Sequence, residues 1–137
     1  MRLFIPGAPV GKGRPRFAKR GAHVVAYTPQ KTAEYERLIK TLYNEKYGKP
    51  EFAEDDALSV EITAYTPIPT SFSKAKKRDA AAAIIRPTKK PDIDNILKAV
   101  MDALNGLAYA DDKQIVAVKA IKIYSAHPGV DIKIEKI

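Results

Sequence analysis

The alternation that begins at Leu58 constrains the fold more than any other feature of the sequence. Leu58, Val60, Ile62 and Ala64 alternate with serine, glutamate, threonine and tyrosine, which is the pattern of a strand with one buried and one solvated face. A sheet built from such strands needs helices on its apolar face. Because a chain of 137 residues supplies one core and little more, we expect a single domain over residues 1–137.

Apolar residues at helical spacing predict two main helices. One begins at Thr28-Pro29, where threonine is the expected N-cap, and ends near Gly48. The other runs from Asn95 to Leu104, and its expected N-cap is Asp94, at the positive end of the helix dipole.

A short helix and several strands make up the rest. The expected segments are a helix through Ala80–Ala83 capped by Ser71 or Ser73, and strands at Leu3–Ile5, His23–Tyr27, Ile84–Ile85, Ile115–Tyr124 and Val130–Ile134. The last two strands are predicted to pair as a hairpin through the turn at residues 127–129. This order predicts an α+β fold, a single two-layer domain with a mixed β-sheet and helices packed on one face.

The composition favours a polyanionic partner. A net charge of +8 points to nucleic acid or an anionic membrane surface. The absence of cysteine excludes disulfides, thiolate zinc sites and cysteine nucleophiles. No apolar run approaches the roughly 20 residues of a membrane span, and the apolar start at Met1–Ile5 stops at Pro6, too short for a signal peptide. We therefore expect a cytoplasmic protein with no membrane partner.

Basic residues gather in two blocks that are expected to contact the phosphates of a nucleic acid. The first block lies in a stretch rich in glycine and proline, which reads as a mobile loop, and consists of Lys12, Arg14, Arg16, Lys19 and Arg20. Its glycines do not have the spacing of a phosphate-binding P-loop. The second block precedes the acidic motif and consists of Lys74, Lys76, Lys77, Arg78, Arg86, Lys89 and Lys90.

Acidic residues follow the second basic block directly. Asp92 and Asp94 are two residues apart, Lys98 lies one helical turn after Asp94, and the pair Asp111-Asp112 follows the helix. Carboxylate ligands without histidine or cysteine suit Mg²⁺, with Mn²⁺ as a substitute. In a basic chain this cluster predicts metal-dependent phosphodiester hydrolysis, because divalent ions neutralise the repulsion between carboxylates and phosphates.

Other interpretations of these residues stay open at this point. Asp94 as a helix cap and Lys98 bridged to Asp102 describe a purely structural cluster. A non-catalytic DNA-binding protein needs only the basic blocks, and a metal-dependent nucleotide phosphohydrolase needs only the acids. Of Asp111 and Asp112, one is expected to face the metal, because adjacent residues of a strand point to opposite faces.

Three segments resemble, in residue type, order and spacing, the signature of the RusA family of Holliday junction resolvases: Pro91–Lys98, Asp102–Gly106 and Asp111–Ile115. Gly11–Phe17 and Tyr27–Pro29 resemble the amino-terminal part of the phage and prophage branch of that family. The resemblance implies a magnesium-dependent crossover junction endodeoxyribonuclease that acts in DNA recombination and repair. It also implies a homodimer that makes paired symmetrical nicks in four-way DNA junctions.

Site residues follow from the same resemblance, position by position. Asp92, Asp94 and Asp112 match the catalytic metal-binding acids, and Lys98 matches the essential lysine. Asp111 matches a supporting acid.

Overall fold

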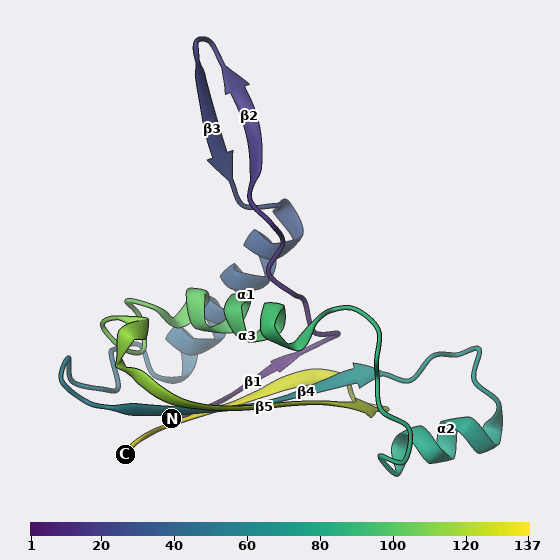
Figure 1. The fold of residues 1–137 in the computed structure, drawn as a ribbon. Helices are drawn as coiled ribbons and strands as arrows, with labels where there is room; N and C mark the ends of the chain where they lie inside the picture. The colour runs from purple at the N-terminus through teal and green to yellow at the C-terminus, as the bar shows by residue number, and fades with distance from the viewer.

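A four-stranded mixed sheet forms the base of the computed structural model, which describes residues 1–137 (Figure 1). Its strands are β1 (Arg2–Pro6), β4 (Leu58–Pro67), β5 (Ile115–Ser125) and β6 (Gly129–Lys136), in the spatial order β1-β6-β4-β5. β6 runs antiparallel to both β1 and β4, whereas β5 runs parallel to β4. The alternation in β4 buries Leu58, Val60, Ile62 and Ala64, as the sequence predicted.

Two helices cover one face of this sheet (Figure 1). α1 (Gln30–Lys46) and α3 (Ile93–Leu104) pack against each other, and their side chains Ile39, Tyr43, Ile96 and Val100 join the sheet in one core. α2 (Lys74–Ala81) lies beyond the end of β4. Its N-cap is Ser73, which is one of the two serines predicted for this position. The predicted α+β architecture, a mixed sheet with helices packed on it, is confirmed.

A second, two-stranded sheet projects away from the domain (Figure 1). β2 (Arg16–Arg20) and β3 (His23–Tyr27) pair antiparallel around Gly21 and Ala22. Gly21 has a φ of 62°, a conformation that favours glycine in a tight hairpin turn. The prediction of a mobile loop is therefore wrong for residues 16–20, which form the strand β2. Pairing with β3 satisfies backbone groups that a projecting loop would leave to water.

The predicted hairpin between the last two strands is wrong. β5 and β6 lie on opposite sides of β4, so residues 126–128 pass the end of β4 instead of joining neighbours. Val130, Ile132 and Ile134 of β6 are almost fully buried, whereas β5 forms an edge of the sheet. Alternation predicts which side chains of a strand are buried, but it does not select the neighbouring strand.

Local boundaries also differ from the predictions. Ile84 and Ile85 form no strand, because their backbone N–H groups turn back to the carbonyl oxygen of Asp79 at the end of α2. The N-cap of α1 is Pro29 rather than Thr28. Within the structure, no helix has the length and apolar character to cross a membrane.

Candidate active site

The chain enters α3 through the two aspartates of the acidic motif. Asp92 occupies the N-cap position and Asp94 lies in the first turn, so the prediction of Asp94 as the cap was wrong by two residues. The Asp92 side chain makes no capping hydrogen bond, and both residues are exposed. Both carboxylates are therefore free to meet a ligand at the positive end of the helix dipole.

A small acidic pocket opens beside α3. It has a volume of about 150 Å³ and is lined by Asp94, Leu97, Lys98, Met101, Asp102 and Asp112. Asp94, Lys98 and Asp102 are spaced four residues apart, which places them along one face of the helix. Asp112 reaches the pocket from the turn that precedes β5. The fold thus brings Asp94, Lys98 and Asp112 together, as the motif suggested, and adds Asp102.

The two acids of the Asp111-Asp112 pair have different surroundings. Asp111 caps the one-turn 3-10 helix η1 (Asp112–Gln114), and its Oδ1 accepts a hydrogen bond from the Lys113 backbone N–H at 3.0 Å. This bond, followed by one with Asp112, lowers the pKa of Asp111. Asp112 is exposed and lines the pocket. Capping of a turn, and not alternation along a strand, separates the two carboxylates.

Gln114 fixes this turn in place. Its side chain is buried, and the amide nitrogen donates to the carbonyl oxygens of Ala53 at 2.7 Å and Asp56 at 3.1 Å. Its Oε1 accepts from the backbone N–H groups of Ala110 and Asp111. A buried amide with all its hydrogen bonds made holds the η1 turn firmly against the loop before β4.

Tyr109 lies close to the acids. Its side chain is buried, and its hydroxyl donates to the Met101 carbonyl oxygen at 2.8 Å. Burial raises the pKa of Tyr109, and the negative charges of Asp112, Asp102 and Asp111 raise it further. The phenol therefore stays protonated and acts as a hydrogen-bond donor.

Asp92 lines a neighbouring pocket instead of the one with Asp94. This second pocket has a volume of about 440 Å³, and its other charged lining residues are Lys12, Arg14 and Lys90. Carboxylate donors suit Mg²⁺ or Mn²⁺ in kind. The positions of these carboxylates do not form a complete metal site, because no three acidic or histidine side chains lie close enough together to hold one ion.

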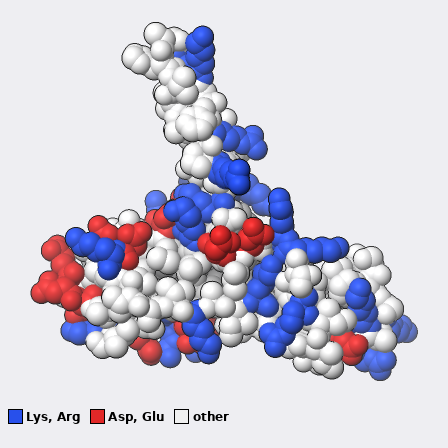
Figure 2. All heavy atoms as spheres, viewed as in Figure 1, with Lys and Arg blue, Asp and Glu red and all other residues white.

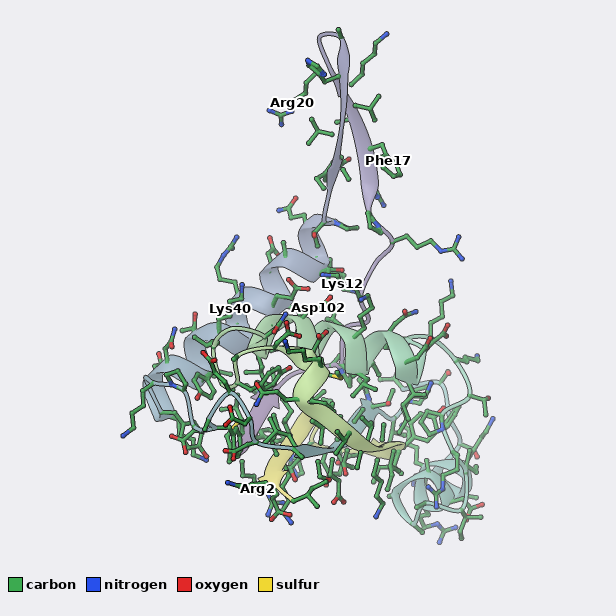
Figure 3. All side chains as sticks on the ribbon, turned by 60° about the vertical axis from the view of Figure 1, so that its left-hand side comes forward. Arg2, Lys12, Phe17, Arg20, Lys40 and Asp102 are labelled. Atoms are coloured by element: carbon green, nitrogen blue, oxygen red, sulfur yellow. The ribbon has the colours of Figure 1, made fainter.

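Lys12 points into the molecule, next to Asp102 (Figure 3). Its Nζ lies 2.5 Å from Glu36 Oε1 of α1 and 3.2 Å from Asp102 Oδ2 of α3. Burial lowers the pKa of Lys12, but hydrogen bonds to the two carboxylates outweigh this effect and leave the pKa raised. The sequence predicted Lys12 as a phosphate contact in an exposed loop, whereas its ammonium group is already engaged between two helices.

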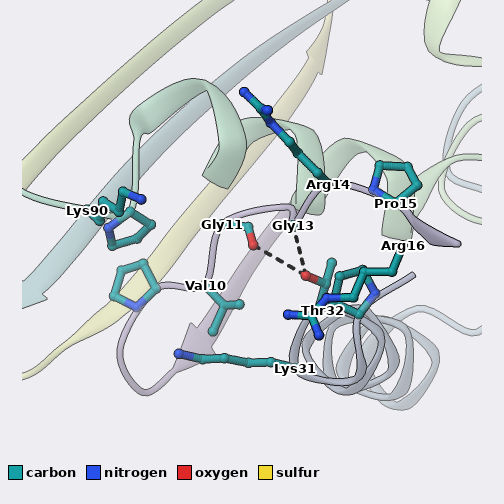
Figure 4. A pocket seen from close by; sticks show the side chains of 12 residues that line it. Val10, Gly11, Gly13, Arg14, Pro15, Arg16, Lys31, Thr32 and Lys90 are labelled. Carbon is teal, nitrogen blue, oxygen red and sulfur yellow. Dashed lines mark hydrogen bonds between the residues drawn. The ribbon is translucent and has the colours of Figure 1, made fainter. Parts of the chain in front are cut away.

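The rest of the first basic block surrounds the hairpin and its base. Arg16, Lys19 and Arg20 are exposed on β2, and basic atoms follow the hairpin in Figure 2. A hollow of about 590 Å³ lies at the foot of the hairpin (Figure 4). Its charged lining residues are Arg14, Arg16, Lys31 and Lys90, and the other residues that line it are uncharged. The charged side chains that line this hollow are therefore all positive.

The second basic block lies on the other side of the acidic pocket. Its members Lys74, Lys76, Lys77, Arg78, Lys89 and Lys90 are all exposed, on α2 or on the segment that leads to α3. Lys122 of β5 anchors that segment, because its Nζ donates to the carbonyl oxygens of Lys89 at 2.7 Å and Pro91 at 3.0 Å. In Figure 2, basic atoms over α2 and at the hairpin base flank acidic atoms over α3.

The sequence reasoning missed three residues of this site. Asp102 was considered as an ion-pair partner of Lys98 and as the start of a family segment but not as a site residue, although its helical spacing from Asp94 was a readable signal. Gln114 and Tyr109 had no such signal, because their partners lie in other segments or become close only when the chain folds.

Comparison with known proteins agrees with the motif. The family model described as Endodeoxyribonuclease RusA matches residues 6–135. The chain is 36% identical over 139 residues to "Uncharacterized protein YqaN" of Bacillus subtilis (strain 168), a match that covers 100% of this chain and 96% of that protein. Because the family model spans nearly the whole chain, including both acidic segments and both basic blocks, the protein belongs to the RusA endodeoxyribonuclease family.

Proposed function

We propose that the protein is a magnesium-dependent crossover junction endodeoxyribonuclease that resolves four-way DNA junctions by paired symmetrical nicks. The acidic pocket carries this proposal: Asp94, Asp102 and Asp112 lie together with Lys98, between two basic surfaces, in a RusA family chain. A phosphate backbone approaches such a pocket only where its acids are neutralised, and divalent cations do this.

We assign metal binding to Asp92, Asp94 and Asp112, with Asp111 in support and Mn²⁺ as the substitute for Mg²⁺. When bound, the ion would polarise a phosphoryl oxygen and lower the pKa of a water. Lys98 is 62% exposed and pairs with Asp102 at 3.6 Å, so its ammonium can meet the negative charge that builds up on the phosphate in the transition state. Asp111 holds the turn that presents Asp112.

DNA contacts are assigned to ten exposed basic residues of the two blocks: Arg14, Arg16, Lys19, Arg20, Lys74, Lys76, Lys77, Arg78, Lys89 and Lys90. On the hairpin these residues occupy both faces, because side chains alternate along a strand. Arg16 and Arg20 lie on one face and Lys19 on the other. Contacts from such residues to phosphates set the register of the duplex arms relative to the acidic pocket.

Paired nicks need two active sites, and a homodimer supplies them. The family resemblance is the basis for this part of the proposal. Light scattering after gel filtration is expected to give about twice the chain mass of 15.1 kDa. A monomer that still makes paired nicks would exclude the dimer.

The decisive experiment compares a synthetic four-way junction with a linear duplex of the same arm sequence, each with Mg²⁺ or with EDTA. Symmetrical nicks are expected in the junction alone and only with Mg²⁺. Junction binding without cleavage in either Mg²⁺ or Mn²⁺ would identify a non-catalytic DNA-binding protein. Turnover of free nucleotides, with indifference to long DNA, would identify a nucleotide phosphohydrolase.

A further inference from the structure

Four side chains of alternating charge connect α1 to the acidic pocket. Lys12 Nζ lies between Glu36 Oε1 at 2.5 Å and Asp102 Oδ2 at 3.2 Å, and Lys98 Nζ lies 3.6 Å from the same Asp102 oxygen. The exposed fraction of the side chain is 16% for Glu36, 17% for Lys12, 29% for Asp102 and 62% for Lys98. The series therefore runs from the interior to the surface on which the DNA is proposed to bind.

The backbone around Lys12 is fixed to both helices. The Lys12 N–H donates to the Asn95 carbonyl oxygen of α3 at 2.8 Å. Thr32 of α1 accepts from the Gly13 N–H at 3.0 Å and donates to the Gly11 carbonyl oxygen (Figure 4). A Cβ atom on Gly13 would lie 2.9 Å from the Pro29 side chain, so the close approach requires glycine. These contacts direct the Lys12 side chain between α1 and α3.

A phosphate contact does not suit Lys12 in this environment. If its ammonium turned outward, Glu36 and Asp102, each less than a third exposed, would lose the cation between them. Removing one partner from a largely buried ion pair is costly, because a charge is left without compensation. A lysine shared by two carboxylates also adds no net positive charge to the surface field.

We propose that Lys12 is a positioning residue of the candidate active site: it holds the Asp102 carboxylate, and Asp102 in turn holds Lys98 at the acidic pocket. This inference rests on the proposed function. Without Lys12, the remaining pair of Lys98 and Asp102 is an i,i+4 contact with the lysine first, which is the weaker orientation on a helix and contributes little in water. Asp102 would then face Asp94 and Asp112 across the pocket without its buried counter-charge.

The test compares Lys12→Met with Arg14→Met, a neighbouring cation that lines the basic hollow and has no carboxylate partner. Junction affinity is measured against salt concentration in EDTA, and the single-turnover cleavage rate is measured with saturating protein in Mg²⁺. For Lys12→Met we expect an unchanged salt slope and a saturated rate reduced by about 10- to 100-fold, as misplacement of a group in an active site causes. For Arg14→Met we expect the salt slope to fall by about 0.9.

Two further measurements keep the test independent of folding and of cleavage. Lys12→Met/Glu36→Gln removes the uncompensated acid, so it should restore the melting temperature but not the rate. The side-chain ammonium signal of Lys98, followed by NMR with labelled lysine, should shift in Lys12→Met and in Asp102→Asn but not in Arg14→Met. This signal tests the link even if the parent protein cuts no DNA, a result that would refute the proposed function alone.

Opposite results would overturn the positioning role. A salt slope reduced by about one unit in Lys12→Met, with a normal saturated rate, would make Lys12 a phosphate contact. A Lys98 signal that is the same in Lys12→Met and the parent protein would show that Lys12 does not act through Asp102. Recovery of the rate together with the melting temperature in Lys12→Met/Glu36→Gln would show a purely structural role.

Discussion

Replacing both Arg16 and Arg20 with glutamine should weaken DNA binding in a salt-dependent way. The two residues pair with Tyr27 and His23 across the hairpin and lie on the same face of it, so one duplex arm can contact both. Each phosphate contact contributes about 0.9 to the slope of log affinity against log salt, so the slope should fall by about 1.8. Between about 50 and about 200 mM salt, the affinity gap between the parent and the variant should then narrow by about twelvefold.

The assay is fluorescence anisotropy of a labelled junction in EDTA, so that no cleavage intervenes. Lys119→Gln/Lys133→Gln is the matched control, because both lysines flank Glu61 on the sheet face opposite the helices. This control removes the same charge from a surface that is not proposed to bind DNA. An equal loss of slope in the control, or an unchanged slope in the hairpin variant, would refute the assignment of the hairpin as a phosphate-binding arm.

The other predictions concern the site and the fold. Asp112→Asn should reduce the cleavage rate by about 100-fold or more while junction binding persists, measured by gel assays; parent-like cleavage would remove Asp112 from the site. Asp111→Ala should lower the melting temperature because it removes the side-chain oxygen that caps η1, and an unchanged calorimetric transition would contradict this role. Burial raises the pKa of Tyr43 from 10.0 to about 12. The protonated phenol therefore stabilises the fold below pH 10, and this stability is lost as the pH rises toward 12. Over that range the melting temperature of Tyr43→Phe should decline less steeply than that of the parent protein, and equal declines would contradict this reasoning. Gly129→Ala should destabilise the protein by about 1–3 kcal/mol, because its Cβ would lie 2.8 Å from the Ile5 carbonyl oxygen; denaturant unfolding indistinguishable from the parent would show that the strand adjusts.

Local regularities were readable from the sequence alone. The period of a strand placed Leu58 and Ile62 on the buried face of β4, and the period of a helix placed Asp94 and Lys98 on one face of α3. A serine cap, Ser71 or Ser73, followed from its position before a helical segment, and the structure has Ser73. These features depend on how a side chain leaves its own backbone, which the residue order sets within a few positions.

Only the tertiary structure decided which segments became neighbours. It set β4 between β5 and β6, turned Lys12 inward to Glu36 and Asp102, and brought Asp112 to the pocket of Asp94 while Asp92 lined another. The physical reason is that a period specifies the buried face of an element but not the element that covers it. That choice depends on packing, and on pairing buried charge, between residues far apart in the chain.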